Sequence, residues 1–399
     1  FWSPITYSGM IQISRSSDRE RFAMMFLILT LGVGLVSSIT ARTINQSFYD
    51  NISFEIGADI VIEPEFLNDF SFEDEEIESL NSSNNFNETT QSVQFQPPPL
   101  ELFSNLPGVK NLATVYRNSL ARMIIPGNIR ESIQFMAVNP YEFSRVAWFR
   151  DDLLPNHINM YLNLLGNTPS GILLSTYARD NIGIEIGDVV QIFWKGQLPL
   201  HMYVLGFIDY WPSFGYGASS IFGVSNFQYV FSRMATEPYE LWMQLSDGAK
   251  RSPLYSAIVD REIQILELRD TAQMNVLAKN DPLIQGTNGV LTFSFITSTV
   301  VTLTGYVLFL VFSLKKRVLQ FGLLRALGLH RRQVVIMLII EQIIIGGYSI
   351  LSGLIIGQIA SVLYVPFLQL AGTIRDNILP FQVVALRSDY FRFYLLSLF

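Results

Sequence analysis

Residues 291–314, LTFSFITSTVVTLTGYVLFLVFSL, form an unbroken run of 24 uncharged residues. As an α-helix with a rise of about 1.5 Å per residue, this run is about 36 Å long, and the hydrocarbon core of a bilayer is about 30 Å thick. Two other segments are similarly apolar: residues 333–370 contain one charged residue, Glu341, and residues 22–40 contain none. Three such segments in one chain predict helices that cross a membrane.

The composition agrees with this prediction, since 49% of the residues are hydrophobic and only 15% are charged, whereas soluble domains average about 25% charged residues. The sequence has no cysteine, which excludes disulfide bonds, thiol catalysis and thiolate metal sites. It also lacks GxxxxGK[ST], GxGxxG, HExxH and GxSxG, motifs of common nucleotide-binding and hydrolase sites. We therefore expect no enzyme activity in this chain, no catalytic residue, no metal, no directly bound cofactor and no nucleic-acid partner.

Lysines and arginines indicate the side of the membrane, because short cytoplasmic loops are enriched in them. Residues 315–332 contain six and no acid, and three arginines precede the first apolar segment, so both segments should be cytoplasmic. Residues 42–290 hold 29 Asp/Glu against 15 Lys/Arg and should lie outside. We expect a multi-pass protein of the inner or plasma membrane. The cations are Lys315, Lys316, Arg317, Arg325, Arg331 and Arg332 in the loop, and Arg15, Arg19 and Arg21 before the first span.

These considerations divide the chain into consecutive predicted segments. We expect a cytoplasmic helix at 1–21, span 1 at 22–41, an extracytoplasmic domain at 42–288, span 2 at 289–314, a cytoplasmic helix at 315–332, span 3 at 333–370, an extracytoplasmic linker at 371–390 and the start of a fourth span at 391–399.

The pattern of the extracytoplasmic segment is typical of a mixed α/β domain. Residues 58–64, 188–194 and 202–211 are rich in β-branched residues between turn residues, which predicts strands, with Gly206 as a candidate bulge. Residues 252–268 carry apolar residues at helical spacing. Residues 68–99 are acidic, rich in Asn and Ser, and end in three prolines, which predicts a disordered-like solvated loop. The expected fold class is therefore α-helical membrane segments plus a mixed α/β extracytoplasmic domain.

The cytoplasmic loop contains the most specific motif. Residues 321–328 read FGLLRALG, Arg331 and Arg332 follow, and Glu341 comes nine residues later. This stretch resembles the cytoplasmic segment of FtsX-like ABC transporter permeases, the MacB/LolC/LolE class. Many members have Glu-Ile where this chain has Gln320 and Phe321, so one acidic contact is missing. Residues 49–64, 106–117 and 171–194 are similar to stretches of the MacB-like periplasmic core domain of that family.

The resemblance implies a mechanism that composition and spacing do not. In this family a separate ATPase dimer, which binds ATP and Mg²⁺, docks on a cytoplasmic coupling helix, and its motion does work on an extracytoplasmic substrate (mechanotransmission). Residues 3–22 are similar to the helix that precedes a repeat in longer members, so a second permease module or copy is expected, and an adaptor or lipoprotein is a further partner. The residues assigned to ATPase contact are Phe321, Gly322, Leu323, Leu324, Arg325, Ala326, Leu327, Gly328, Arg331 and Arg332.

The loop residues themselves permit two interpretations. Small residues at Gly322, Ala326 and Gly328 would let a helix sit closely in a cleft of a partner, with the neighbouring leucines in apolar contact. A basic helix beside the membrane also lies well on anionic membrane lipid.

The third span contains two further candidate features. Glu341 is its sole ionisable residue, for which we expect a structural role, the alternative being a proton or ion relay. Gly353 and Gly357 form a GxxxG pair, which together with Gly346 and Gly347 predicts a helix-packing face. Two other function classes stay open from the residues alone: an ion-coupled transporter that uses Glu341, and a membrane-anchored sensor that binds an extracytoplasmic ligand without ATP.

Overall fold

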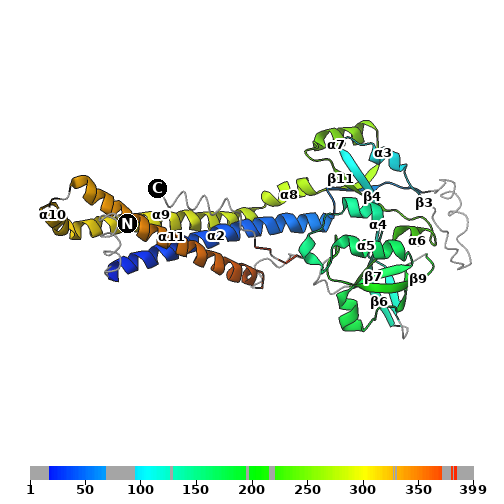
Figure 1. Cartoon of the computed structure of the whole chain (residues 1–399). Helices are drawn as coiled ribbons and strands as arrows, with labels where there is room; N and C mark the ends of the chain where they lie inside the picture. The colour runs from blue at the N-terminus through cyan, green and yellow to red at the C-terminus, as the bar shows by residue number, and fades with distance from the viewer. Residues whose placement is uncertain are drawn as a thin grey trace, which may run out of the picture. The chain divides into compact units, whose positions relative to one another are not determined.

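A computed structural model describes most of the chain (Figure 1). The described residues are 18–68, 95–125, 129–194, 197–214, 221–326, 328, 330–370, 379–380 and 382–383. The predicted fourth span lies outside them, as do most of the predicted linker at 371–390, most of the predicted loop at 68–99 and most of the predicted helix at 1–21. The chain divides into two compact units, one formed by residues 1–48 and 278–399 and the other by residues 49–277.

Long helices make up the first unit. They are α2 (Asp18–Ile56), α9 (Pro282–Lys316) and α11 (Arg331–Leu370), and the short helix α10 (Val318–Ala326) lies between the last two in sequence. Within the described residues, three helical stretches are long and apolar enough to cross a membrane: Met24–Ile56, Pro282–Lys316 and Arg331–Val365. Large apolar side chains are exposed along α9, as expected for a helix that faces lipid.

The second unit is built on a ten-stranded mixed sheet with the order β10-β7-β9-β8-β5-β6-β4-β11-β1-β12. Its strands are β1 (Ile60–Pro64), β4 (Val109–Asn118), β5 (Arg122–Ile125), β6 (Ile129–Val138), β7 (Gly171–Ser175), β8 (Val189–Phe193), β9 (Leu200–Ile208), β10 (Ile221–Asn226), β11 (Glu240–Leu245) and β12 (Ile265–Asp270). A separate pair joins β2 (Leu67–Asn68) to β3 (Phe95–Gln96). The shorter helices are α3 (Leu100–Ser104), α4 (Pro140–Val146), α5 (Ile158–Asn167), α6 (Phe227–Phe231), α7 (Arg251–Asp260) and α8 (Thr271–Lys279), with a 3₁₀ turn at Asp151–Leu153 and a π turn at Ala178–Ile182.

Part of this sheet closes on itself. Strand β10 pairs in parallel with β6 in addition to β7, so β10, β7, β9, β8, β5 and β6 form a ring of hydrogen-bonded strands. Alternate side chains on these strands, among them Met123, Phe135, Leu174 and Met202, are buried together in one cluster. Because side chains alternate between the faces of a strand, this cluster fills the inside of the ring.

A second cluster lies on the other face of the sheet, where α4 and α5 contribute apolar side chains. Phe143 of α4 stacks on Trp211 with ring centroids 5.5 Å apart, and it also contacts Trp242 of β11 at 5.3 Å. Helical apolar segments combined with a mixed α/β domain are therefore confirmed as the fold class.

Local predictions within the α/β unit have mixed outcomes. The three predicted strands correspond to β1, β8 and β9, and the pairing of β7 with β9 skips Leu205, so a bulge lies beside Gly206 as predicted. The prediction of a helix at 252–268 is wrong for the second half of that range. Helix α7 ends at Asp260, and the following residues form β12, in which Leu268 pairs with Ile62 of β1. Pairing with a distant strand outweighed the local helical pattern.

Candidate functional site

Helix α10 is separated from α9 by one residue, Arg317. Four of its residues follow the spacing i, i+3, i+4 and i+7, which places them on one side of the helix. All four are exposed, and the two leucines expose 88% and 67% of their surfaces. We call this surface the α10 face; it consists of Leu319, Gly322, Leu323 and Ala326. Because contiguous exposed apolar patches mark interaction sites, the α10 face is the candidate docking surface.

The other predicted contact residues surround the α10 face or lie outside the description. Phe321 is half-buried and Arg325 is exposed, whereas the side chain of Leu324 and all of Leu327 lie outside the described residues. Leu319 was missed by the sequence prediction. Its position four residues before Leu323 is the signal that could have identified it.

Glycine stands at two positions of the motif, 322 and 328, for different structural reasons. A Cβ atom added at Gly322 would meet nothing within 4 Å, so the described packing does not require a glycine there, and its absence of a side chain leaves room for a partner. Gly328 has a φ of 95°, in the left-handed region that favours glycine. Its N–H donates to the carbonyl of Arg325 at 3.1 Å. Gly328 therefore ends α10 and turns the chain toward α11.

Two exposed arginines, Arg331 and Arg332, begin helix α11. The N-terminus of a helix carries partial positive charge, so each cation there is unfavourable by about 0.3–1 kcal/mol. The backbone N–H of His330 donates to the side-chain oxygen of Gln333 at 2.9 Å, which caps this helix end without an acid. Cations kept at an unfavourable helix end favour contact with an anionic group outside the helix.

Glu341 is part of a buried ion pair. Nη1 of Arg317 donates to both oxygens of the carboxylate, at 2.6 and 2.8 Å. The glutamate side chain is only 1% exposed and the arginine 14%. The pair joins the end of α9 to α11, and it supports the structural role expected for Glu341. Sequence reasoning counted Arg317 among the loop cations and did not assign it this partner.

The predicted glycines of α11 differ in their surroundings. A Cβ at Gly353 would lie 3.1 Å from Cβ of Leu31, and one at Gly357 would lie 3.2 Å from the carbonyl oxygen of Gly32, so this pair faces α2 at close range. A Cβ added at Gly346 would lie 3.8 Å from the Tyr306 hydroxyl, while one at Gly347 would meet nothing within 4 Å. The GxxxG pair thus lies where the backbones of α2 and α11 approach each other.

The stretch that carries these features matches a known family. Residues 291–398, which include all of α10 and α11 and most of α9, match the model of the FtsX-like permease C-terminal domain. This part of the chain is similar to the C-terminal domain of FtsX-like permeases. The match supports a permease subunit, and the three helices that are long and apolar enough to cross a membrane agree with it.

The chain was also compared with curated proteins and with solved structures. No curated protein matches the chain. Similar solved structures include a domain of a permease protein from Porphyromonas gingivalis, with 14% identity, a TM-score of 0.27, and coverage of 42% of this chain and 77% of that one. Another is the extracellular domain of the ABC-type transporter YknZ from Gram-positive bacteria, with 13% identity, a TM-score of 0.29, and coverage of 52% of this chain and all of that domain.

Proposed function

We propose that this permease couples ATP hydrolysis by a separate ATPase to work on an extracytoplasmic substrate, and that the ATPase docks on the α10 face. The observation that carries the proposal is the exposed apolar surface of α10, formed by Leu319, Gly322, Leu323 and Ala326, within the segment that matches the family. ATP and Mg²⁺ would bind to the partner ATPase, since this chain has no phosphate-binding motif.

Short connections would allow α10 to transmit a displacement. One residue separates it from α9, and the Arg317–Glu341 pair fixes that junction against α11. When two ATPase subunits close on ATP, a push on α10 would therefore move both long helices. Because a dimeric ATPase offers two docking sites, we expect a second permease module or copy beside this one.

The α/β unit is the proposed extracytoplasmic part, and the helices then cross the plasma membrane several times. The excess of acids over bases between residues 42 and 290 and the basic loop at 315–332 both support this orientation. The work would be mechanotransmission, in which the α/β unit changes the state of a substrate, adaptor or lipoprotein outside the membrane.

The test is purification of the tagged full chain from its native membranes with its ATPase. Leu323→Glu places a charge in the α10 face and should reduce the recovered ATPase by at least about tenfold, because a buried unpaired charge costs several kcal/mol. The matched control is Leu266→Glu, the same substitution at a similarly exposed leucine of the α/β unit, which should leave recovery unchanged.

Two outcomes would count against the proposal. If Leu323→Glu retained the ATPase while tryptophan fluorescence stayed unchanged, α10 would not be the docking helix. If no ATPase accompanied the unaltered chain, a ligand-binding sensor without ATP coupling would be the better description.

A further inference from the structure

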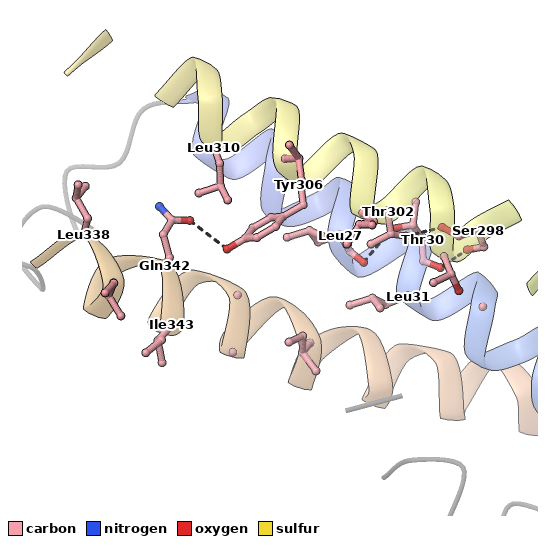
Figure 2. A pocket seen from close by; sticks show the side chains of 18 of the residues that line it. Leu27, Thr30, Leu31, Ser298, Thr302, Tyr306, Leu310, Leu338, Gln342 and Ile343 are labelled. Carbon is pink, nitrogen blue, oxygen red and sulfur yellow. Dashed lines mark hydrogen bonds between the residues drawn. The ribbon is translucent and has the colours of Figure 1, made fainter. Parts of the chain in front are cut away.

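The three long helices line a half-open cavity of about 550 Å³ within the same unit as α10 (Figure 2). Residues between 27 and 34 of α2, 295 and 314 of α9, and 335 and 350 of α11 line it. Ligand sites in proteins commonly have volumes of about 300–1,000 Å³. Since all three wall segments belong to the apolar spans, an occupant would lie at the depth of the bilayer's hydrocarbon.

Most polar groups in the walls already have partners. The Thr30 hydroxyl donates to the carbonyl of Phe26 at 2.8 Å, and Ser298 donates to the carbonyl of Thr30 at 2.7 Å. Thr299 and Thr302 donate to carbonyls one turn earlier in α9. With these donors satisfied, the walls present chiefly aliphatic surface, which favours a hydrocarbon chain over an ion or a polar solute.

One end of the cavity approaches the cytoplasmic cations. Leu314 lines the cavity and is followed directly by Lys315 and Lys316, and Val335 lines it one turn after Arg331 and Arg332. Arg317 is already paired with Glu341. Within the described part of the chain, no carboxylate pairs with any of the other four cations. An apolar cavity therefore ends beside four cations whose charge is not matched by an acid of the described chain.

We propose that this cavity binds one acyl chain of an anionic phospholipid, whose phosphate is held by Lys315, Lys316, Arg331 and Arg332. The occupant is argued from charge complementarity, because an aliphatic groove capped by cations matches a molecule with a hydrocarbon tail and an anionic head. The lipid fills the space between the α2–α11 contact at Gly353 and the Arg317–Glu341 pair. This site is separate from the α10 face and does not depend on the ATPase.

The test measures binding of two phospholipids with the same fluorescent acyl chain, phosphatidylglycerol and phosphatidylcholine, to the purified full chain in neutral detergent. Phosphatidylglycerol should bind at least about fivefold more tightly, since each cation near an anionic lipid contributes about that factor. Leu310→Trp fills the cavity and should weaken binding of both lipids by about tenfold or more. Leu308→Trp is the matched control, because Leu308 is exposed on the same helix and does not line the cavity.

The contribution of the headgroup is tested separately. The double variant Lys315→Gln/Lys316→Gln should lose most of the preference for phosphatidylglycerol and keep its affinity for phosphatidylcholine. A matched double variant in the other unit, Lys110→Gln/Lys250→Gln, should keep the preference.

Three results would overturn the proposal. Equal affinity for the two lipids would show that the four cations do not bind the phosphate. Equal binding by Leu310→Trp and Leu308→Trp would show that the acyl chain does not occupy the cavity. The third uses the absence of cysteine from the chain, which makes Ile343→Cys a unique attachment point for a photo-crosslinker. Crosslinks in a bilayer to another segment of the chain or to a second copy, instead of to lipid, would show that protein fills the cavity.

Discussion

The α/β unit and the region around α10 handle charge in opposite ways. In the α/β unit the buried carboxylate of Asp270 is bound by the Arg251 guanidinium at 2.8 Å, by the Tyr255 hydroxyl and by the N–H of Ala272 at 2.7 Å. Around α10, one buried pair accompanies several exposed cations and an exposed apolar face. A carboxylate so fully bonded is a structural element, whereas exposed leucines and cations are suited to binding another molecule.

A second acid in the α/β unit follows the same rule. Glu237 accepts hydrogen bonds from Trp194 at 2.9 Å, from Gln197 at 2.9 Å and from the hydroxyl of Tyr116. Burial, and then the bond to this carboxylate, raise the pKa of Tyr116. The hydroxyl therefore stays a donor throughout the physiological range, and Glu237, like Asp270, is held by several donors of its own unit.

The largest effect is expected from removing the Arg317–Glu341 ion pair beside α10, which should change this region and leave the α/β unit intact. Arg317→Ala leaves Glu341 buried without its cation, which costs about 3–5 kcal/mol. Spin labels on cysteines placed at Leu319 and Ile336 should then report a broadened distance distribution between α10 and α11, while tryptophan fluorescence of the α/β unit stays unchanged.

Two controls show whether the charge pair is responsible. The charge reversal Arg317→Glu/Glu341→Arg should at least partly restore the narrow distribution, and Arg325→Ala, which removes an exposed cation of α10, should not broaden it. A narrow distribution in Arg317→Ala itself would mean that the pair does not position α10.

The converse change disrupts the α/β unit and spares α10. Gly57 has a φ of 87°, and a Cβ there would lie 2.2 Å from Cη2 of Trp242. Gly57→Ala therefore combines backbone strain with a clash in the core and should reduce the free energy of unfolding by about 2–4 kcal/mol. Urea unfolding followed by tryptophan fluorescence measures this, because four of the five tryptophans lie between residues 148 and 242.

The matched control is Gly183→Ala. Gly183 also has a positive φ, 79°, but a Cβ there would meet nothing within 4 Å. Gly183→Ala should reduce the free energy of unfolding by only about 1 kcal/mol, because it adds backbone strain without a clash. Equal losses in the two variants would show that Trp242 moves aside and that the contact with Gly57 is not restrictive.

The same contrast explains what the sequence could predict. The apolar spans were evident because length and lack of charge are properties of a continuous segment, and the FGLLRALG motif identified α10 for the same reason. By contrast, α2 continues to Ile56, well beyond the predicted end of span 1 at residue 41. The added part is more polar, so a lack of charge could not indicate where the helix ends.

Contacts between distant segments were harder to predict. The strand at Ile265–Asp270 has a helical pattern and becomes a strand only because β1 lies beside it. Six cations lie in the loop that precedes Glu341, and nothing in their order indicates that Arg317 is its partner. Leu319 precedes the family motif, so a motif-based prediction missed the most exposed residue of the α10 face.

A smaller effect than that of Gly57→Ala is expected at Tyr255, and it tests whether water has access to the carboxylate of Asp270. Burial, followed by the hydrogen bond and the charge of Asp270, raises the pKa of Tyr255 from 10.0 to about 12. Because the folded-state pKa is above the unfolded value, the stabilising contribution of the neutral hydroxyl is complete below pH 10 and is lost as the pH rises toward 12.

Tyr255→Phe removes a hydrogen bond to a charged group and should reduce the free energy of unfolding by about 1.5–3 kcal/mol at pH 7. Urea midpoints of the two proteins should converge between pH 10 and 12, whereas Tyr203→Phe, at an exposed site, should show no such convergence. A constant difference across that range would mean that Tyr255 does not lose its hydrogen bond by ionising, and that water or another group shares the carboxylate of Asp270.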